Sequence, residues 1–232
     1  MIALTSKKLF LRRKVIYFAP KPSFSLNPFD AYVQCSSTDE YRGFKRTPKY
    51  TTIVDLLQSE EDLVKNFDKN TSYEVRRAAK EGLTIAVNVT ESDFLALYNS
   101  FAGKKNLGMV KDISTFRGHL QITGAFFENK PLVFHSYILD RNKKRVRLLH
   151  SASALYEAEN ATLKPLIGRA NRYLHYMDMT YFKNEGFAEY DFGGYAKDTE
   201  NESLKGINKF KDGFGGALVE ESNYETIIAR LL

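Results

Sequence analysis

The stretch that decides the fold is Tyr190-Asp191-Phe192-Gly193-Gly194, together with Phe210-Lys211-Asp212-Gly213-Phe214-Gly215-Gly216 further along the chain. Each stretch joins aromatic residues, ionisable groups and glycines. Glycine permits tight bends and close approach of the backbone, and polar side chains at such bends are common in functional loops. These two stretches are therefore the first candidates for a functional site.

Regular elements are expected on both sides of them. A strand over Phe187 to Phe192 follows a long helix over Leu163 to Asn184, on which apolar residues recur every three or four positions. Thr162 is a suitable N-cap for this helix, and Gly186 a suitable stop. Before the helix, short polar links favour antiparallel hairpins between three strands, at Ile122 to Phe127, Leu132 to Leu139 and Arg145 to Ser153.

The remaining elements alternate between strands and helices. Further strands are predicted at Lys14 to Ala19, Thr51 to Asp55, Leu83 to Val89 and Ala217 to Glu220. Further helices are predicted after Ser59, at Ser72 to Glu81, after Ser92, at Ile113 to Leu120 and at Leu204 to Lys211. Strands on both sides of the long helix predict a mixed α/β layer architecture.

The composition is that of a globular protein. Of the 232 residues, 43% are hydrophobic and 27% are charged, which suffices for a sizeable core. No Pro/Gly/Ser-rich linker divides the chain, so we expect an N-terminal extension or vestigial subdomain over 1–49 and one main domain over 50–232. The net charge of +6 suits anionic partners, although a solvated lysine-rich surface would give the same value.

The single cysteine, Cys35, cannot form an intramolecular disulfide, which suggests a reducing compartment. The apolar run Val15 to Ala19 is too short for a signal-peptide core or a membrane span, so a cytoplasmic location is predicted. The basic residues around it allow peripheral contact with an anionic membrane, or they form an ordinary basic surface. These basic residues are Lys7, Lys8, Arg12, Arg13 and Lys14.

Several common chemistries have no support. The four histidines, His119, His135, His150 and His175, are too widely spaced for a local metal site, and Cys35 has no CxxC partner, so no metal is predicted. The chain also lacks a GxSxG nucleophile elbow, a GxxxxGK[ST] loop and a GxGxxG turn that opens a helix. Hydrolase and nucleotide-binding motifs of these kinds are therefore excluded.

Four motifs in order resemble the Fem-like branch of the GNAT acyltransferase superfamily. They are the strand at Tyr50 to Asp55, the helix with Tyr73 to Gly82, and the two glycine-containing stretches. The resemblance covers roughly Tyr50 to Glu220. It implies a GNAT-like α/β fold, with a central mixed, mostly antiparallel sheet flanked by helices. It also implies direct transfer of an acyl or aminoacyl group from an activated donor to an amine.

The identity of the donor stays open. Members of the superfamily that use acyl-CoA hold its pyrophosphate on a glycine-containing loop, which we expect here at Ala154 to Ala161. That loop has no glycine, and Glu157 and Glu159 would repel phosphate. A helical arm for tRNA, common in Fem ligases, is not evident either. We expect no permanently bound cofactor, and the donor is aminoacyl-tRNA, an acyl carrier protein or CoA held in an unusual way.

Catalysis is predicted for two side chains, Asp191 from its place at a strand end beside two glycines and Lys211 from the segment that resembles a Fem motif. Asp191 is predicted to act as a general base on the attacking amine or to orient it, and the alternative is a carboxylate that caps the following turn. Lys211 is predicted to stabilise the oxyanion or the phosphate of the donor, and the alternative is an exposed lysine at a helix end. Around them, substrate contact is predicted for Phe210, Gly193, Gly194, Gly213 and Gly215. The alternative for Phe210 is a packing role in the core or the wall of the cleft. The alternative for Gly213 and Gly215 is that glycine is needed there only for the backbone conformation.

Further substrate contacts are predicted with alternatives. His150 and Ser151 lie on adjacent faces of a central strand, one of which should face the acceptor, whereas a core histidine is the alternative. Tyr195 could donate a proton to a leaving group or simply pack. Arg76 and Arg77 could bind a phosphorylated acceptor or form a solvated helix face, and the same choice applies to arginines on the long helix.

The leading hypothesis is transfer to an amine on a cell-envelope or polysaccharide precursor. A first rival is an N-acyltransferase for an amino-sugar or small molecule, supplied by CoA or an acyl carrier protein. A second rival is a non-catalytic module that binds RNA or another partner through Arg141, Lys143, Lys144, Arg145 and Arg147. The sequence does not determine the oligomeric state.

Overall fold

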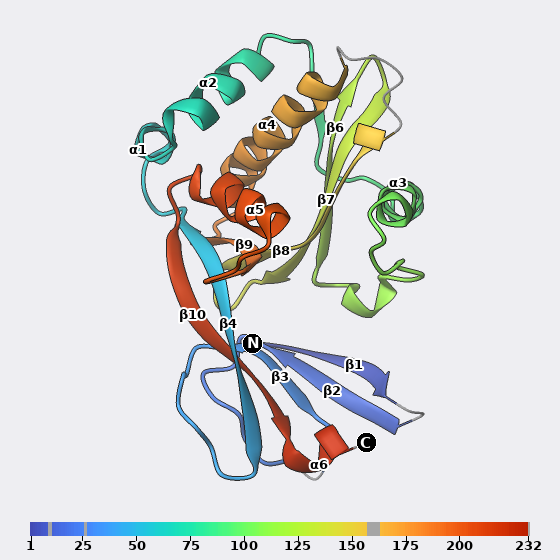
Figure 1. Ribbon diagram of the computed structural model, residues 1–232, viewed down its shortest axis with the longest axis vertical. Coiled ribbons are helices and arrows are strands. Elements are labelled where there is room, and N and C mark those ends of the chain that lie inside the picture. The colour runs from blue at the N-terminus through green and yellow to red at the C-terminus, as the bar shows by residue number, and fades with distance from the viewer. Residues whose placement is uncertain (9–10, 26, 157–162, 232) are drawn as a thin grey trace. The chain divides into compact units, whose positions relative to one another are not determined.

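The computed structural model describes residues 1–8, 11–25, 27–156 and 163–231 (Figure 1). The chain forms two compact units. Unit 1 consists of Met1–Ile53, Gly194–Asn208 and Ala217–Leu232, and unit 2 consists of Val54–Gly193 and Lys209–Gly216. Both units are therefore built from segments that are distant in sequence.

Unit 1 contains a twisted sheet in the order β1-β2-β3-β10-β4. Its strands are β1 (Ile2–Lys8), β2 (Leu11–Tyr17), β3 (Ala31–Cys35), β10 (Ala217–Thr226) and the larger part of β4 (Phe44–Asp55). Neighbours are antiparallel except β2 and β3, which are parallel. The short helix α6 (Ile227–Leu231) ends the unit. Residues 31–35 and 44–49 of the predicted N-terminal extension pair with the C-terminal strand β10. The predicted division at residue 49 stays a prediction.

Unit 2 carries the strand order β9-β8-β7-β6-β5. These strands are β9 (Glu189–Tyr195, of which Glu189 to Gly193 belong to unit 2), β8 (Arg145–Ser153), β7 (Lys130–Asp140), β6 (Leu120–Phe127) and β5 (Thr84–Ala86). Strands β8 and β9 are parallel, and the other pairs are antiparallel.

Helices flank the strands of unit 2 (Figure 1). They are α1 (Glu60–Lys65), α2 (Lys69–Ala78), α3 (Glu91–Lys104), α4 (Leu163–Asn184) and the end of α5 (Glu202–Asp212). Helix α4 contacts β6, β7 and β8 and also α2, whereas α3 contacts β7 and β8. A core of aliphatic and aromatic side chains fills the space between these helices and the strands.

Local signals explain why these elements form. Ser59, Asp68 and Thr90 accept hydrogen bonds from backbone amides in the first turns of α1, α2 and α3, as expected of N-caps. The predicted long helix and the antiparallel hairpins of β6, β7 and β8 are confirmed. The predicted helix over Ile113 to Leu120 is wrong, since only one 3₁₀ turn forms at Ser114–Phe116. Thr162, the predicted N-cap of α4, lies outside the described residues.

The expected fold class is confirmed. The described residues form a mixed α/β structure with ten strands, mostly antiparallel, and helices that flank them. Within these residues, none of the helices has both the length and the apolar character needed to cross a bilayer.

Candidate active site

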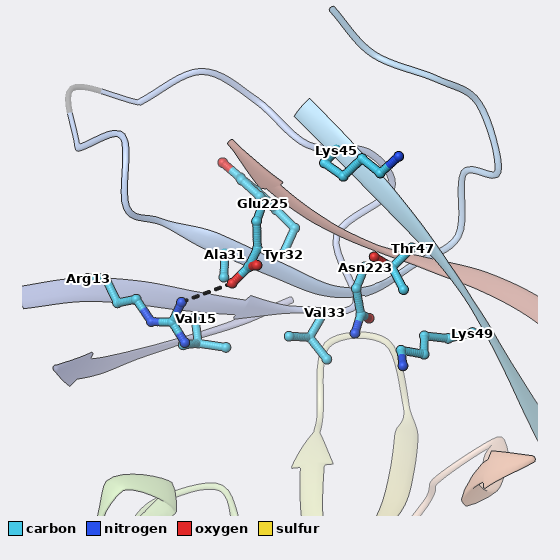
Figure 2. A pocket seen from close by; sticks show the side chains of 10 residues that line it. All are labelled: Arg13, Val15, Ala31, Tyr32, Val33, Lys45, Thr47, Lys49, Asn223 and Glu225. Carbon is cyan, nitrogen blue, oxygen red and sulfur yellow. Dashed lines mark hydrogen bonds and ion pairs between the residues drawn. The ribbon is translucent and has the colours of Figure 1, made fainter. Parts of the chain in front are cut away.

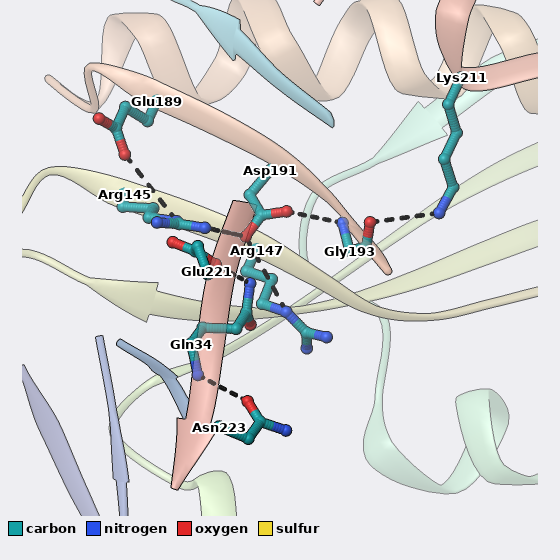
Figure 3. Close-up of polar contacts among 9 residues, drawn as sticks. All are labelled: Gln34, Arg145, Arg147, Glu189, Asp191, Gly193, Lys211, Glu221 and Asn223. Atoms are coloured by element: carbon teal, nitrogen blue, oxygen red, sulfur yellow. Dashed lines mark hydrogen bonds and ion pairs between the residues drawn. The ribbon is translucent and has the colours of Figure 1, made fainter. Parts of the chain in front are cut away.

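The centre of the candidate site in unit 2 is the buried carboxylate of Asp191 on β9. The parallel pairing of β8 with β9 sets Arg147 beside Asp191 and Arg145 beside Glu189. Asp191 is fully buried, and its Oδ2 accepts hydrogen bonds from Nη2 and Nε of Arg145 at 2.6 and 3.2 Å. Its Oδ1 accepts a hydrogen bond from the amide of Gly193 at 2.8 Å (Figure 3). The carboxylate therefore ties β8 to the bend at Gly193 within β9.

Gly193 is a glycine for two independent reasons. Its φ of +72° lies in the left-handed region that side chains disfavour. A Cβ at this position would also lie 2.9 Å from the carbonyl oxygen of Leu148 on β8. Only glycine fits both the conformation and the space, so the bend that directs the Gly193 carbonyl depends on this residue.

Lys211, near the end of α5, reaches the same bend. Its Nζ donates a hydrogen bond to the carbonyl oxygen of Gly193 at 3.3 Å (Figure 3). The side chain is largely buried, with 9% of the residue exposed. Burial lowers the pKa of Lys211 to about 8, Asp191 opposes that change, and the charge of Arg147 adds to it. Lys211 thus remains mostly protonated at pH 7 but is much less stable as a cation than an exposed lysine.

Two arginines accompany Lys211, and we call the three side chains the cation cluster. The guanidinium of Arg147 lies 3.7 Å from the position of a Cβ on Gly193, measured from Nη2. The guanidinium of Arg172, on α4, lies over the ring of Phe210 at 5.0 Å from its centroid. Within the described part of the chain, the Nε atoms of both arginines are buried without a hydrogen-bond acceptor. Arg145 and Arg147 share the carboxylate of Asp191, since Nε of Arg147 lies 3.9 Å from the Oδ2 that accepts from Arg145. The cations outnumber this one carboxylate, so the cluster favours an anionic group.

Buried side chains of α4, β7 and β9 form a chain of hydrogen bonds in the same unit. The hydroxyl of Tyr137 donates to Oδ2 of Asp178 at 2.5 Å, so it must accept from the hydroxyl of Tyr190, 2.7 Å away. Tyr190 must in turn accept from Nδ1 of His175 at 2.6 Å. Burial holds the pKa of His175 well below its usual value, and interactions with His135, Lys211 and Arg172 act in the same direction. His175 is therefore neutral, with its proton on Nδ1.

This chain positions the end of α5. The ring of His175 lies 5.5 Å from the rings of both Phe210 and Phe214, measured between centroids. The hydrogen bond of its Nδ1 to Tyr190 fixes the ring, and the ring supports Phe210 and Phe214, which lie on either side of Lys211 in the sequence. The sequence suggested only that His175 is not part of a local metal site. Its role as a support depends on contacts between α4, α5 and β9.

The other predicted residues of the second stretch have packing roles. Gly213 accepts a hydrogen bond from the amide of Asp68 at 2.9 Å, and a Cβ on it would lie 2.5 Å from Oγ1 of Thr71. Gly215 has a φ of +72°, and a Cβ on it would collide with the carbonyl of Asn66. Both glycines therefore let α5 end against the link between α1 and α2. Their predicted contact with substrate stays a prediction.

His150 and Ser151 are consecutive residues of β8, and His150 packs against α3. The hydroxyl of Ser136 lies 2.8 Å from Nδ1 of His150, and the ring of Tyr98 lies 4.9 Å from the His150 ring, measured between centroids. Burial, with the charge of Arg147, lowers the pKa of His150 to about 4, so this histidine is neutral at pH 7. Arg147 thus acts electrostatically on both His150 and Lys211, a link that the sequence did not reveal.

Four predicted residues are placed elsewhere. Arg76 and Arg77 are exposed on α2, where Arg77 pairs with Glu81 at 3.2 Å, as on a solvated helix face. Tyr195 and Gly194 continue β9 but belong to unit 1. Substrate contact by these residues stays a prediction.

One of the five basic residues proposed for RNA binding, Arg145, is not available on the surface. Arg145 is 7% exposed and pairs with Asp191, so it does not belong to an open basic surface. The loop expected to meet CoA, Ala154 to Ala161, falls mostly outside the described residues. Its predicted role in excluding CoA is therefore still a prediction.

Comparisons with known proteins were made with the sequence and with the structure. No family model and no curated protein matches the sequence. The structure is similar to that of FemX, with a TM-score of 0.68 and 15% identity over 99% of this chain and 85% of that one. It is also similar to L-PGS from Bacillus licheniformis, with a TM-score of 0.59 and 12% identity over 99% of this chain and 85% of that one.

A third similar structure is the C-terminal domain of a putative lysylphosphatidylglycerol synthetase from Agrobacterium fabrum. Its TM-score is 0.58, with 13% identity over 87% of this chain and 70% of that one. At these identities the likeness concerns the fold. The expected Fem-like fold is confirmed.

Proposed function

We propose that this protein transfers an acyl or aminoacyl group from an activated donor to an amine. The observation that carries the proposal is the buried ammonium of Lys211, held 3.3 Å from the Gly193 carbonyl with Arg147 beside the same bend. A cation kept in a poorly solvated place can stabilise negative charge far better than one in water. The fold that this chain shares with FemX and L-PGS is consistent with such a reaction.

In the proposed step the amine nitrogen attacks the carbonyl carbon of the donor ester or thioester. The carbonyl oxygen becomes an oxyanion, which the ammonium of Lys211 stabilises. The carbon–nitrogen bond forms, the bond to the leaving oxygen or sulfur breaks, and the leaving group takes up the proton lost by the amine. Asp191 serves here as a positioning residue, because its oxygens accept from Arg145 and Gly193. Its predicted role as general base awaits a test of activity.

The acceptor is proposed to be an amine on a cell-envelope or polysaccharide precursor. The donor is proposed to be aminoacyl-tRNA, an acyl carrier protein or acyl-CoA held in an unusual way. The site could use any of the three, since Lys211 acts on the carbonyl that all of them share. The choice therefore requires direct measurement with each donor.

The test compares Lys211→Ala with Lys209→Ala, which removes the same charge from the exposed side of the same helix. Purified protein is given bulk tRNA charged with labelled amino acids, or labelled acetyl-CoA, together with an amine-containing envelope extract. We expect Lys211→Ala to lower the rate of label transfer by about 10²-fold or more, while Lys209→Ala keeps the wild-type rate. Equal rates in the two variants, or no transfer by the wild type from any donor, would refute the proposal.

A further inference from the structure

A hollow on one face of the unit 1 sheet is not explained by the proposed reaction. It has a volume of about 250 Å³ and is lined by side chains of β2, β3, β4 and β10 (Figure 2). Strand pairing explains how these side chains meet, because Glu225 is opposite Lys45 and Asn223 is opposite Thr47. Alternation along each strand then brings every second side chain to this face.

The lining carries more positive than negative charge. Nη1 of Arg13 pairs with Oε1 of Glu225 at 3.2 Å, and Glu225 is the one carboxylate among the lining residues. Lys45 and Lys49 are exposed at the hollow, and neither forms an ion pair within the described ranges. Lys49 is opposite Glu221 in the β4–β10 register, but Glu221 is buried and accepts a hydrogen bond from Nε2 of Gln34 at 2.8 Å.

Uncharged groups in the lining add hydrogen-bonding capacity and an apolar floor. Oδ1 of Asn223 accepts a hydrogen bond from the backbone amide of Gln34 at 2.9 Å, so the NH₂ group of Asn223 keeps its donors for another partner. Thr47 contributes a hydroxyl. Val15 and Val33 supply a flat aliphatic surface between these polar groups (Figure 2).

We propose that this hollow binds a phosphate ester carried by a small hydroxylated unit, such as a sugar phosphate or a glycerophosphate headgroup. Lys45, Lys49 and Arg13 supply charge-assisted hydrogen bonds to phosphate oxygens. Asn223 and Glu225 supply a donor and an acceptor for hydroxyl groups. The volume is just below the roughly 300–1,000 Å³ of pockets that enclose whole drug-sized ligands, which suits a single headgroup.

The ester could be free or part of a phospholipid, and the binding chemistry is shared. This site is inferred from unit 1 alone and does not depend on the proposed transfer reaction. A binding assay on the full chain therefore tests it separately. The probes are glycerol 3-phosphate, N-acetylglucosamine 1-phosphate and inorganic phosphate, measured by titration calorimetry at low salt, and vesicles of phosphatidylglycerol with phosphatidylcholine, measured by sedimentation.

The key variant is Lys45→Ala with Lys49→Ala, and its control is Lys14→Ala with Lys21→Ala. The control removes the same charge from exposed positions that do not line the hollow, and Lys14 is on the opposite face of β2. We expect the key variant to bind at least one ester about tenfold more weakly, and the control to stay within about twofold of wild type. Since both lysines are exposed, the key variant should keep the wild-type melting temperature.

Binding of free esters only would identify a soluble ligand, whereas lysine-dependent binding of the vesicles as well would identify a lipid headgroup. Either result supports the site. Equal binding by the two double variants, no binding of either ester, or equal affinity for inorganic phosphate would overturn the proposal. Lysine-dependent binding of a short RNA without binding of the esters would also overturn it, in favour of a nucleic-acid surface.

Discussion

Replacing Lys211 by methionine should make the folded protein more stable at neutral pH and should abolish transfer. Burial lowers the pKa of Lys211 from its ordinary value of 10.5 to about 8. One pH unit corresponds to 1.36 kcal/mol, so holding this ammonium in the folded state costs about 3 kcal/mol below pH 8. Methionine fills similar space without charge. It loses the hydrogen bond to Gly193, worth about 1 kcal/mol.

The net expectation is a gain of about 2 kcal/mol in the free energy of unfolding at pH 7. Its pH dependence follows from the direction of the pKa change. Between pH 8 and 10.5 the unfolded chain binds more protons at this residue than the folded chain. The wild type therefore gains stability as the pH rises through this window and loses it as the pH falls towards 8. Lys211→Met lacks this gain. The difference in unfolding free energy in its favour should therefore shrink as the pH rises, and the wild type should be the more stable protein by about pH 10.

Urea unfolding of the wild type, Lys211→Met and Lys209→Met at pH 7, 8.5 and 10 would measure these differences. Lys209 is exposed on the same helix, so its variant should match the wild type at each pH. The transfer assay on the same samples should show loss of activity only for Lys211→Met. A variant at Lys211 that is less stable at pH 7, or a stability difference that does not change with pH, would refute the reasoning. The buried ammonium would then carry no energetic cost that a function has to explain.

Local patterns in the sequence predicted much of unit 2. The apolar repeat of α4 and the short polar links of β6, β7 and β8 are strong signals, because periodicity and turn residues act over a few positions. In unit 1 the strands β2, β4 and β10 were predicted in part, whereas β1 and β3 were missed. Strand β3 pairs with β10, which lies almost at the other end of the chain, as between Ala31 and Glu225. Local sequence patterns do not predict pairing between strands so far apart in the sequence.

The candidate site was predicted in part. Asp191, Gly193 and Lys211 were expected to belong together, and they do meet at one bend. The pairing of Asp191 with Arg145 was not expected, because it depends on the parallel register of β8 and β9. Arg147 was assigned to a surface patch for the same reason. A sequence shows that an arginine is present, but only strand pairing decides which carboxylate it meets.

Two further substitutions test the supports of the site. Gly193→Ala should lower the free energy of unfolding by about 1–3 kcal/mol and reduce transfer, because its positive φ and a β8 carbonyl leave no room for a methyl group. Gly194→Ala is the control for thermal unfolding, since nothing lies within 4 Å of its Cβ position, and equal losses would contradict the account. Tyr137→Phe should lower the free energy of unfolding by about 1–3 kcal/mol. Asp178 loses the buried hydroxyl that donates to it, and the hydroxyl of Tyr190 loses its acceptor. The control is Tyr181→Phe, a partly exposed tyrosine on the same core, which should change the melting temperature little. A Tyr137 variant as stable as this control would show that the buried hydrogen bonds of Tyr137 do not stabilise the fold.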